Sequence, residues 1–436
     1  MKLTKNCKIA IQQLNNSGYK AYAVGGAVRD FLLGRQITDI DITTSAIPEQ
    51  ILEVFKDYKT YPTGIKHGTI TVKVGEEFFE ITTFRKDSEY TLNRWPKQVD
   101  FINDVREDLK RRDFTINAIA YNDNEGYVDI FNGKTDCKNK IIRAVGDAEV
   151  RFQEDALRIL RALRFASVLN FKIEYKTSLA IINQRHLLKN VSKERIYSEL
   201  VKILLGDNVE EVLLKYKKVF FSIINKLELC DGFDHKSKFH SYDVYTHIVK
   251  SVAYSVKDKV IRLALLLHDV EKPSCFTLDS KGIGHFYTHQ EKSSKTAVQI
   301  LKDLKADNKT IKEIEFLIKY HDTQIDADKV TVKKWLNFAG EKYLKDLMMV
   351  KIADAKAHAK GYVVKRQETA ENVIKLIDEI IKNNECYTLK QLKIDGKDLK
   401  EKGYQGERIA SKLQDLLNKV IEGSVENKKE ELLKIV

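Results

Sequence analysis

Two aspartates, Asp39 and Asp41, are the residues whose spacing most clearly suggests chemistry. They follow Gly25-Gly26, a predicted turn where the backbone can approach a phosphate and offer it free N–H groups. Arg29 lies one helical turn further on and can reach the same phosphate. On a predicted strand, residues two apart project from one face, so the two carboxylates could hold Mg²⁺. A lone Asp-x-Asp is more often a pair of solvated acids, but the turn and the arginine favour metal-dependent phosphoryl or nucleotidyl transfer.

A third carboxylate would complete this metal site. Glu80 is the first choice, because it lies in an apolar and β-branched strand and so has a reason to face a metal. Asp100 is the alternative, and a solvated Glu80 is an equally good interpretation. Further along, Arg112 can contact a triphosphate. Asp113 can accept a hydrogen bond from a ribose 2′-hydroxyl, the group that separates RNA from DNA precursors.

Residues 154–165 are predicted to lie on one helix, and this segment gives the strongest indication of which nucleotides are substrates. Asp155 and Arg158 are three apart, so they would be neighbours on its surface, an acceptor beside a donor. Cytosine and adenine present an amino donor next to a ring-nitrogen acceptor, whereas guanine and uracil present the opposite order. The pair would therefore accept C and A without a template, although an ordinary ion pair is the alternative. Arg161 and Arg164 continue the row, with Arg164 turned toward phosphate or structure.

A second group of potential metal ligands lies in the C-terminal half of the chain. His268-Asp269 follows an apolar run, with His247 upstream and Asp354 far downstream. This resembles the HD-domain pattern of one histidine, an adjacent His-Asp pair and a distant aspartate. Such a pattern predicts a divalent transition metal that activates water against a phosphoester.

Three further residues bear on the HD interpretation. His289 and His321 are additional ligands in a two-metal version of the site. Glu271 stands where many HD proteins carry glycine, and its side chain could crowd the site or act as an extra ligand. A helical scaffold without metal is therefore the alternative.

The elements that must position these residues change character along the chain. Strands are expected at 19–24, 38–44, 69–74 and 78–84, the last two joined by a hairpin turn that begins at Gly75. From about residue 149 onward helices are expected almost throughout, for example at 154–169, 193–205, 244–256, 259–267 and 291–304. The pattern predicts an α+β unit followed by an all-helical remainder.

Composition narrows the class of protein. The 436 residues are 43% hydrophobic, enough for two to four domains with real cores. A net charge of +12 favours a polyanionic partner, although a lysine-rich surface also serves solubility. The five cysteines are widely spaced without metal-ligand pairing, which indicates a reduced cytoplasmic protein. No apolar run approaches membrane-spanning length and no secretory signal is visible, so no membrane partner is expected.

Taken in order, these segments resemble the bacterial class II tRNA nucleotidyltransferases, a family that includes CCA-adding enzymes and poly(A) polymerases. The matching stretches are 25–41, 64–69, 80–85, 111–118, 129–133, 154–165 and 193–200. The resemblance implies a polymerase-β-like α+β head followed by an all-α neck, body and tail. It also implies Mg²⁺ as cofactor, CTP and ATP as substrates, and tRNA 3′ ends as acceptors.

The resemblance assigns residues and boundaries as well. Asp39 and Asp41 are the metal ligands. The nucleotide contacts are Gly26, Arg29, Arg112, Asp155, Arg158, Arg161 and Arg164. Residues 1–145 are expected to form the head and 146–206 a neck that recognises the base. Residues 207–359 would form the body, with the HD module at about 243–357, and 360–436 a tail that binds tRNA.

Other functions stay open on the sequence. A poly(A) polymerase shares the head motifs. Residues 85–100 are present, and in the family this region accompanies A addition, so an enzyme that adds only C is disfavoured. An HD-type phosphohydrolase acting on nucleotides or RNA ends, with a head that only binds nucleotide, is a third interpretation. A non-enzymatic RNA-binding protein is a fourth, and the intact Asp39–Asp41 pair argues against both of these.

Overall fold

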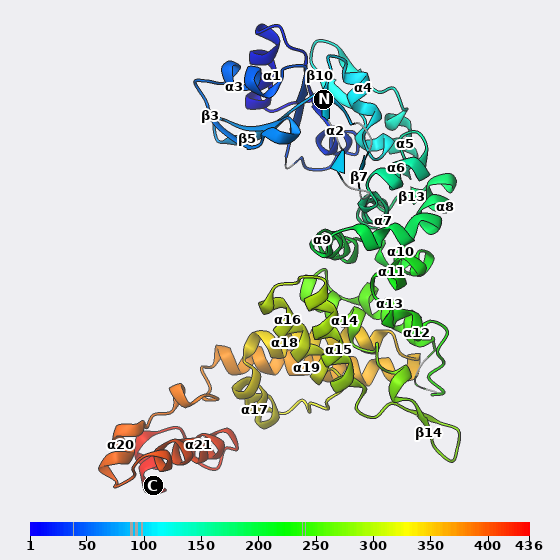
Figure 1. Cartoon of the computed structure of the whole chain (residues 1–436). Helices are drawn as coiled ribbons and strands as arrows, with labels where there is room; N and C mark the ends of the chain where they lie inside the picture. The colour runs from blue at the N-terminus through cyan, green and yellow to red at the C-terminus, as the bar shows by residue number, and fades with distance from the viewer. Residues whose placement is uncertain (38, 88–89, 92–94, 97–98, 238, 240) are drawn as a thin grey trace. The chain divides into compact units, whose positions relative to one another are not determined.

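The computed structural model describes residues 1–436 except 38, 88–89, 92–94, 97–98, 238 and 240 (Figure 1). The chain folds into two compact units, Met1–Ile223 and Ile224–Val436, and each is described by itself. The first unit contains a mixed sheet and helices, and the second is almost entirely helical.

A seven-stranded sheet, in the order β11-β10-β1-β2-β5-β4-β3, forms the centre of the first unit. In that order the strands are Gly126–Val128, Ala120–Asn122, Ala21–Val24, Asp41–Thr44, Glu77–Thr83, Thr69–Val74 and Lys59–Gly64. Only β2 and β5 pair in parallel, and every other neighbouring pair in this sheet is antiparallel. The C-terminal end of β1 therefore lies beside the N-terminal end of β2, where the aspartates occur.

Residue patterns explain these strands. All four residues of β1 are buried, as expected for a strand covered on both faces. In β4 buried and half-buried residues alternate, because successive side chains point to opposite faces. Gly75, with φ +60°, turns β4 into β5 and confirms the predicted hairpin. The helices α1 (Lys5–Asn16) and α3 (Pro48–Val54) contact this part of the sheet.

Helices follow the sheet within the first unit. They are α6 (Ala148–Glu154), α7 (Leu157–Leu169), α8 (Tyr175–Gln184), α9 (Lys193–Leu204), α10 (Val209–Lys215) and α11 (Lys217–Ile223). The expected single helix over 154–169 is wrong: Asp155, with φ −139° and ψ 102°, ends α6, and α7 begins two residues later. The apolar face of α7 packs against α9.

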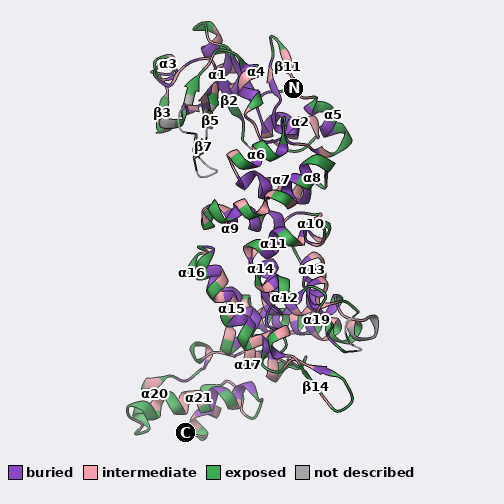
Figure 2. Cartoon of the chain, turned by 45° about the vertical axis from the view of Figure 1, so that its right-hand side comes forward, coloured by how far each residue is buried: buried purple, intermediate pink, exposed green. Residues whose placement is uncertain are grey.

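Helices of the second unit begin at side-chain caps. The main helices are α13 (Val244–Tyr254), α14 (Lys259–Leu267), α15 (His289–Asp303), α16 (Asn308–Tyr320), α17 (Lys329–Ala339), α18 (Glu341–Lys356) and α19 (Lys360–Lys382). Asp243, Asp258 and Asp307 each accept hydrogen bonds from the first free N–H groups of α13, α14 and α16. Every residue of α14 after Lys259 is buried, so this helix is central to the core (Figure 2).

The last segment has a hydrophobic core of its own. Three helices, α20 (Gly396–Glu401), α21 (Glu407–Ile421) and α22 (Lys429–Lys434), surround it. Its buried members include Leu399, Leu416, Leu417 and Leu432. The buried residues of this core begin at Cys386, whereas α19 packs against α18, so the tail boundary at residue 360 stays a prediction.

The predicted fold class, an α+β head followed by helices, is confirmed. The observed boundaries of the strands and helices differ from the predicted ones by a few residues. The strand expected at 38–44 begins at Asp41, and Thr38 lies outside the described residues. The helix expected at 244–256 ends at Tyr254, whereas 259–267 matches α14 at both ends. Among the described residues, no helix is both long and apolar enough to cross a membrane.

Candidate functional site

The glycine turn lies where β1 gives way to α2 (Gly26–Leu32). Gly25 has φ +74°, a conformation that side chains rarely adopt. A Cβ on Gly25 would lie 3.3 Å from Nη1 of Arg112 and 4.0 Å from Oδ2 of Asp41. The turn, an arginine and a carboxylate thus meet at one point, as predicted. Any larger residue at position 25 would fill the space between them.

The predicted carboxylates lie at the same end of the sheet. Asp41 begins β2, opposite Val24 at the end of β1. Because Ile42 pairs with Ile81 in the parallel ladder, Asp41 comes beside Glu80 on β5. Asp39 precedes the strand, so the two aspartates do not share a strand face as expected. All three acids are exposed.

Electrostatics indicate that these acids share one environment. Partial desolvation raises the pKa of Asp41, and the carboxylates of Glu80 and Asp39 raise it further, against Arg112, which lowers it. Three carboxylates that repel one another are a suitable oxygen donor set for Mg²⁺. They do not form a closed cage: among the described residues, ligand groups whose atoms all lie within 4.8 Å of one another occur only in the second unit.

The predicted arginines of the head are held by internal partners. Arg29 is buried and bonds Asp30 at 2.9 Å and Asn117 at 2.8 Å. Arg112 reaches Oδ2 of Asp108 at 3.4 Å, and its Nε is buried without a hydrogen-bond partner among the described residues. Asp108 is fully buried and also binds Arg111 at 2.8 Å. The guanidinium of Arg112 therefore keeps bonding capacity at the glycine turn.

Asp113 is bound on both carboxylate oxygens. Oδ1 accepts from the backbone N–H of Phe114 at 2.8 Å and from Asn117 at 3.1 Å, and Oδ2 accepts from Nε of Arg161 at 2.7 Å. Burial raises the pKa of Asp113, but Arg161 and Asn117 outweigh it and lower the pKa to about 2. In this arrangement Asp113 anchors Arg161. Its role toward a ribose hydroxyl stays a prediction.

The two residues predicted to recognise the base, Asp155 and Arg158, are not arranged as an ion pair on one helix. Asp155 lies at the break between α6 and α7, where its Oδ2 accepts from Arg195 at 2.9 Å. Arg158 is buried and bonds Glu154 at 2.6 Å and the backbone carbonyl of Arg111 at 2.9 Å. Asp155 and Arg158 do not lie on one helix as expected, and the alternative, an ion pair between them, is not found among the described residues. Each is held by a partner of its own, so the two are positioned independently.

The remaining arginines of α7 surround one aromatic ring. Arg164 forms an ion pair with Glu199 of α9 at 2.9 Å. The guanidinium carbons of Arg29, Arg161 and Arg164 lie 5.0, 5.6 and 4.4 Å from the centre of the Phe165 ring. Three cations over one ring bring positive charge close to the glycine turn. This feature was not foreseen, although the Arg-x-x-Arg spacing before Phe165 carries its signal.

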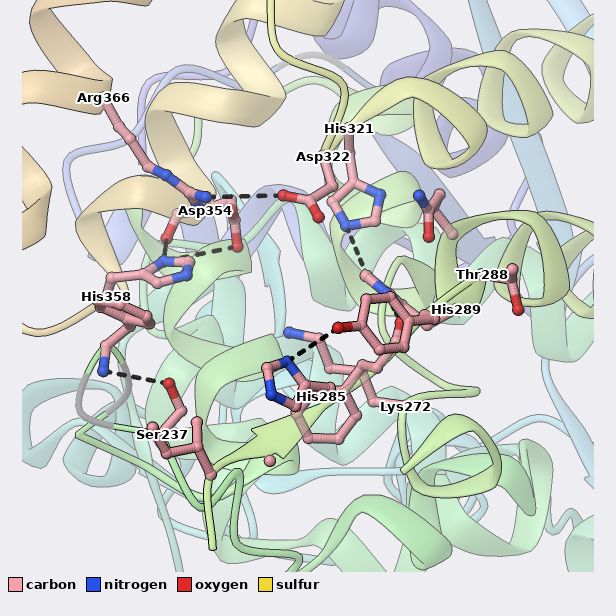
Figure 3. Close-up of a pocket in the computed structure, with 16 residues that line it drawn as sticks. Ser237, Lys272, His285, Thr288, His289, His321, Asp322, Asp354, His358 and Arg366 are labelled. Carbon is pink, nitrogen blue, oxygen red and sulfur yellow. Dashed lines mark hydrogen bonds and ion pairs between the residues drawn. The ribbon is translucent and has the colours of Figure 1, made fainter. Parts of the chain in front are cut away.

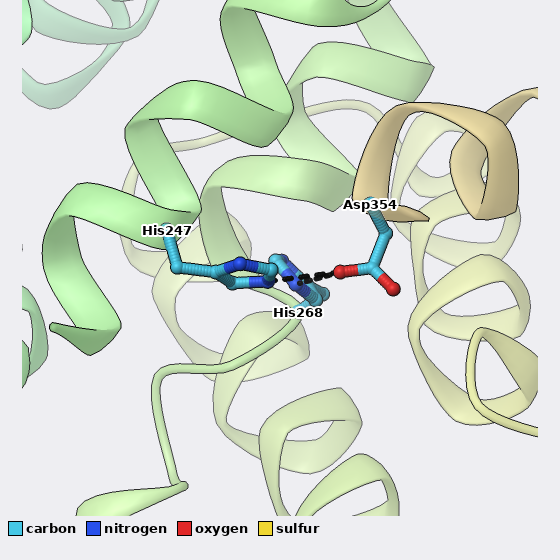
Figure 4. Close-up of side chains that lie close together, drawn as sticks. All are labelled: His247, His268 and Asp354. Atoms are coloured by element: carbon cyan, nitrogen blue, oxygen red, sulfur yellow. Dashed lines mark hydrogen bonds and ion pairs between the residues drawn. The ribbon is translucent and has the colours of Figure 1, made fainter. Parts of the chain in front are cut away.

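The residues that resemble the HD pattern come together in the second unit as one group, the HD cluster of His247, His268, Asp269 and Asp354. His247 of α13 lies 2.9 Å from Oδ1 of Asp354 on α18, measured from Nε2. Nε2 of His268, which follows α14, lies 3.4 Å from the same oxygen. Figure 4 shows the three side chains pointing at one another from separate helices. Their ligand atoms all lie within 4.8 Å of one another, a group that could hold a metal ion.

A second group shares the centre of this cluster. His268, Asp269 and His321 also have ligand atoms within 4.8 Å of one another. Nε2 of His289 lies 3.4 Å, and Nε2 of His321 3.7 Å, from Oδ1 of Asp269. His289 and His321 face each other in Figure 3, with 3.4 Å between their Nε2 atoms. The structure thus brings together the additional ligands of the predicted two-metal version.

Backbone contacts orient three of these rings. Nδ1 of His268, His289 and His321 each lies 2.7 Å from the carbonyl oxygen three residues earlier. In a neutral imidazole, Nδ1–H then donates to the carbonyl and leaves the Nε2 lone pair directed at the cluster. Metal-bound histidines in proteins are oriented in the same way.

Buried polar atoms that lack a well-aligned hydrogen bond also favour a cation. Nε2 of His268 and both carboxylate oxygens of Asp269 are buried and form no well-aligned hydrogen bond among the described residues. Burial lowers the pKa of His268, but Asp269 and Asp354 outweigh it and raise the pKa to about 10. The carboxylates that attract a proton there would also attract a divalent cation.

Glu271 does not crowd the cluster. Its carboxylate binds Lys226 at 2.7 Å, Ser274 at 2.6 Å and Thr296 at 2.8 Å. The cation next to the ligands is instead Lys272, whose Nζ lies 2.7 Å from Oδ2 of Asp269. The departure from the HD pattern at Glu271 therefore has a structural role.

Comparisons with known proteins bear on the whole chain. Family models match residues 21–143 as "Poly A polymerase head domain" and residues 279–436 as tRNA nucleotidyltransferase domain 2. Residues 170–218 match "Probable RNA and SrmB-binding site of polymerase A". The crystal structure of the Bacillus stearothermophilus CCA-adding enzyme in complex with CTP is 30% identical, with a TM-score of 0.75, and the match covers 100% of this chain and 98% of that one. The chain belongs to the tRNA nucleotidyltransferase family.

Other members of the tRNA nucleotidyltransferase family have a higher sequence identity to this chain, but the match covers a smaller part of it. The CCA-adding enzyme of Lactococcus lactis is 52% identical over 204 residues, which are 46% of this chain and 51% of that protein. That of Lactobacillus helveticus is 55% identical over 196 residues, 45% of this chain and 49% of that protein. The chain thus spans about half the length of the curated relatives it matches. His247, His268 and Asp269 lie outside the three ranges that family models match.

Several residues of the candidate site were not assigned a role from sequence. Asp108 was missed because its neighbours in the chain look like an ordinary charged helix. Arg195 and Glu199 lay within a segment that matched the family, but only the fold shows that they hold Asp155 and Arg164. At the HD cluster, Arg366 was missed because it comes from a separate helix, α19.

Proposed function

We propose that this chain adds C, C and A to the 3′ end of tRNA, using CTP and ATP and no template. The observation that carries the proposal is the meeting of the Gly25 turn, Asp41 and Arg112 at one end of the sheet. The family membership supports it, and so does the full-length similarity to a CCA-adding enzyme with bound CTP. A poly(A) polymerase would share these head residues.

In the proposed reaction the tRNA 3′-hydroxyl attacks the α-phosphorus of the nucleotide. The bond from that phosphorus to the bridging oxygen breaks, pyrophosphate leaves, and the hydroxyl proton is released. Asp39, Asp41 and Glu80 would hold Mg²⁺, which neutralises phosphate charge and activates the hydroxyl. The Gly25 turn lets the triphosphate approach the backbone, and Arg112 donates to it.

Base selection is proposed to depend on Asp155 and Arg158. The carboxylate accepts from the amino group of C or A, and the guanidinium donates to the adjacent ring nitrogen. A base with the opposite order would leave buried groups unpaired, which costs free energy. The partners that hold each side chain, Arg195 and Glu154, support this role because they fix the orientation of donor and acceptor.

The proposed partner is tRNA, and the proposed setting is the cytoplasm. A net charge of +12 suits a polyanion, and the five cysteines are free and buried, as in proteins from reducing compartments. We also propose the division into a head to residue 145, a neck to 206, a body to 359 and a tail beyond. The separate core of the last segment supports a distinct tail.

Incubation with tRNA that lacks its 3′ CCA, with each labelled nucleotide in turn, tests the proposal. CTP alone should extend this tRNA by two residues, and ATP alone should extend tRNA ending in CC by one. UTP and GTP should give no product. Incorporation of none of the four nucleotides would refute the nucleotidyltransferase assignment. Incorporation of ATP into many positions would instead identify a poly(A) polymerase.

A second function, phosphoester hydrolysis at the HD cluster, is favoured by one observation. The ligand atoms of His247, His268 and Asp354 lie within 4.8 Å of one another, and Nε2 of His268 is buried without a hydrogen-bond partner among the described residues. His247, His268 and Asp354 would hold a divalent transition metal, which would supply an activated water for attack on phosphorus. The P–O bond to the sugar would break, and the alcohol would leave with a proton. Removing damaged phosphate ends from RNA would fit beside addition to tRNA 3′ ends.

Metal analysis and a hydrolysis assay on one variant test the second function. The purified protein should hold a divalent metal and hydrolyse a phosphomonoester or a 2′,3′-cyclic phosphate. His268→Ala should lose both and keep nucleotide addition, whereas His186→Ala, an exposed histidine of the first unit, should change neither. No bound metal, together with no hydrolysis across several metals, would leave the cluster as a scaffold.

A further inference from the structure

A cavity of about 470 Å³ opens directly beside the HD cluster. Its walls include the ligands His289, His321 and Asp354, so whatever fills it lies next to the proposed metal. Figure 3 shows these side chains facing the same space as Lys272 and Arg366. The volume falls within the range of pockets that bind small molecules.

One wall of this cavity presents a pair of stacked rings. The rings of His285 and Tyr287 are nearly parallel, with 4° between their planes and 5.4 Å between their centres. Tyr287 is 70% exposed, which is unusual for a large aromatic side chain in a cavity wall. An exposed, preorganised ring of this kind is a suitable surface for a planar base.

The fold holds the ring pair in a fixed position. His285 belongs to β15 (Gly284–His285), which pairs with β14 (Thr277–Leu278), and its Nε2 lies 3.1 Å from Oδ2 of Asp279. A Cβ on Gly284 would lie 2.2 Å from the carbonyl oxygen of His235, so the hairpin packs against that loop without room for a side chain. Tyr287 is thereby anchored only two residues before the ligand His289, at most ~7 Å along the chain.

Cations on other elements face the same cavity. Lys272 lies beside Asp269, and the ion pairs of Arg366 with described residues are long, 3.7 Å to Asp322 and 4.0 Å to Asp354. Arg366 is half exposed and could turn to a phosphate without breaking a short contact. The cavity therefore combines an aromatic wall, two cations and the metal-ligand cluster.

We propose that this cavity binds the terminal nucleoside phosphate of the HD reaction, with its base stacked on Tyr287 and its phosphate beside the cluster. The inference rests on the second proposed function and adds a base-binding surface and a specificity-determining residue. The shared chemistry is a base joined to a phosphate, carried either by a free nucleotide or by an RNA 3′ end. A phosphoester without a base would lack the stacking contact.

Substrate pairs measured on matched variants test the inference. In the metal-loaded protein, Tyr287→Ala should lower the preference for adenosine 3′-monophosphate over glycerol phosphate, as a ratio of kcat/KM, by about tenfold, because stacking on an aromatic side chain contributes that much or more. The loss should appear in KM. Tyr287→Phe should restore the preference, and Tyr254→Ala, an exposed tyrosine on α13, should not change it. An RNA oligonucleotide with a 3′-phosphate, compared with the free nucleotide, distinguishes the two sources.

Binding measurements distinguish failure of the base-binding proposal from failure of the hydrolase proposal. Equilibrium binding of adenosine 3′-monophosphate and of inorganic phosphate is compared in wild type and Tyr287→Ala, and only the part lost in the variant is assigned to this cavity. If hydrolysis is absent but the variant binds the nucleotide about tenfold more weakly, the pocket stands and the hydrolase proposal fails. If hydrolysis occurs and Tyr287→Ala leaves both the preference and the binding unchanged, the base-binding inference is overturned.

Discussion

The two ligand groups of the molecule are built in opposite ways. In the head, Asp39, Asp41 and Glu80 are exposed, lie at strand ends and do not close to within 4.8 Å. In the HD cluster the ligands His268 and Asp269 are fully buried and belong to a group of close ligand atoms. The head carboxylates thus form an open site at the edge of the sheet with space for substrate. The ligands of the HD cluster instead surround a buried centre.

This difference suggests when each site acquires its metal. Mg²⁺ in phosphoryl-transfer sites is bound through a few carboxylates together with substrate phosphates, so an open edge suffices until nucleotide arrives. A transition metal is held by a nearly complete set of protein ligands. We expect the head to exchange its metal freely and the HD cluster to retain one.

The largest effect is expected from removing a head carboxylate. Asp41→Asn keeps the shape of the side chain but removes its charge, so nucleotide addition should fall by about a thousandfold or more while tRNA binding changes little. Asp39→Asn should act in the same direction. Asp57→Asn, an exposed acid of the same unit, serves as control in the incorporation assay. Near-normal addition by Asp41→Asn would remove the head from the chemistry.

Chelation should separate the two sites. After dialysis against a chelator, nucleotide addition should return at once when Mg²⁺ is added, because the head ligands are exposed. Metal at the HD cluster should be lost slowly and should be absent from His268→Ala from the start. Elemental analysis over time measures both. Equal rates of loss and recovery at the two sites would contradict the proposed difference.

A smaller effect is expected at the base reader, which distinguishes an independently held pair from a simple ion pair. Asp155→Ala should lower the use of CTP and ATP by about tenfold to a hundredfold and relax discrimination against UTP and GTP. Arg195→Ala frees the same carboxylate and should weaken selectivity less. Steady-state kinetics with each of the four nucleotides measure the rate and the selectivity of both variants. Unchanged selectivity in both variants would make Asp155 purely structural.

The smallest expected effect concerns stability. Because Arg161 and Asn117 lower the pKa of Asp113 to about 2, the charged form stabilises the fold above its unfolded pKa, and this contribution is lost as pH falls through about 2. It amounts to about 2 kcal/mol at most. The stability difference between wild type and Asp113→Asn should therefore shrink from about pH 5 downward, as measured by urea unfolding. A difference independent of pH would mean that Asp113 is not charged in the folded protein.

The sequence predicted the parts of the site that depend on local spacing. Gly25, Asp41 and the His268-Asp269 pair each lie where a strand or helix begins or ends, and such boundaries are visible in residue patterns. The break at Asp155 was not predicted, because residues 154–165 have an unbroken helical pattern and tertiary contacts decide the turn. Partners such as Asp108, Arg195 and Arg366 come from elements that only the fold brings together.

Sequencing the 3′ ends of tRNA after incubation with CTP and ATP together is the most direct test of the proposed addition reaction. A tRNA that lacks its terminal residues should gain C, C and A in that order and no further nucleotide. The same product should form with His268→Ala, because the HD cluster takes no part in addition. Products ending in a run of A, or no extension of any tRNA, would show that this protein is not a CCA-adding enzyme.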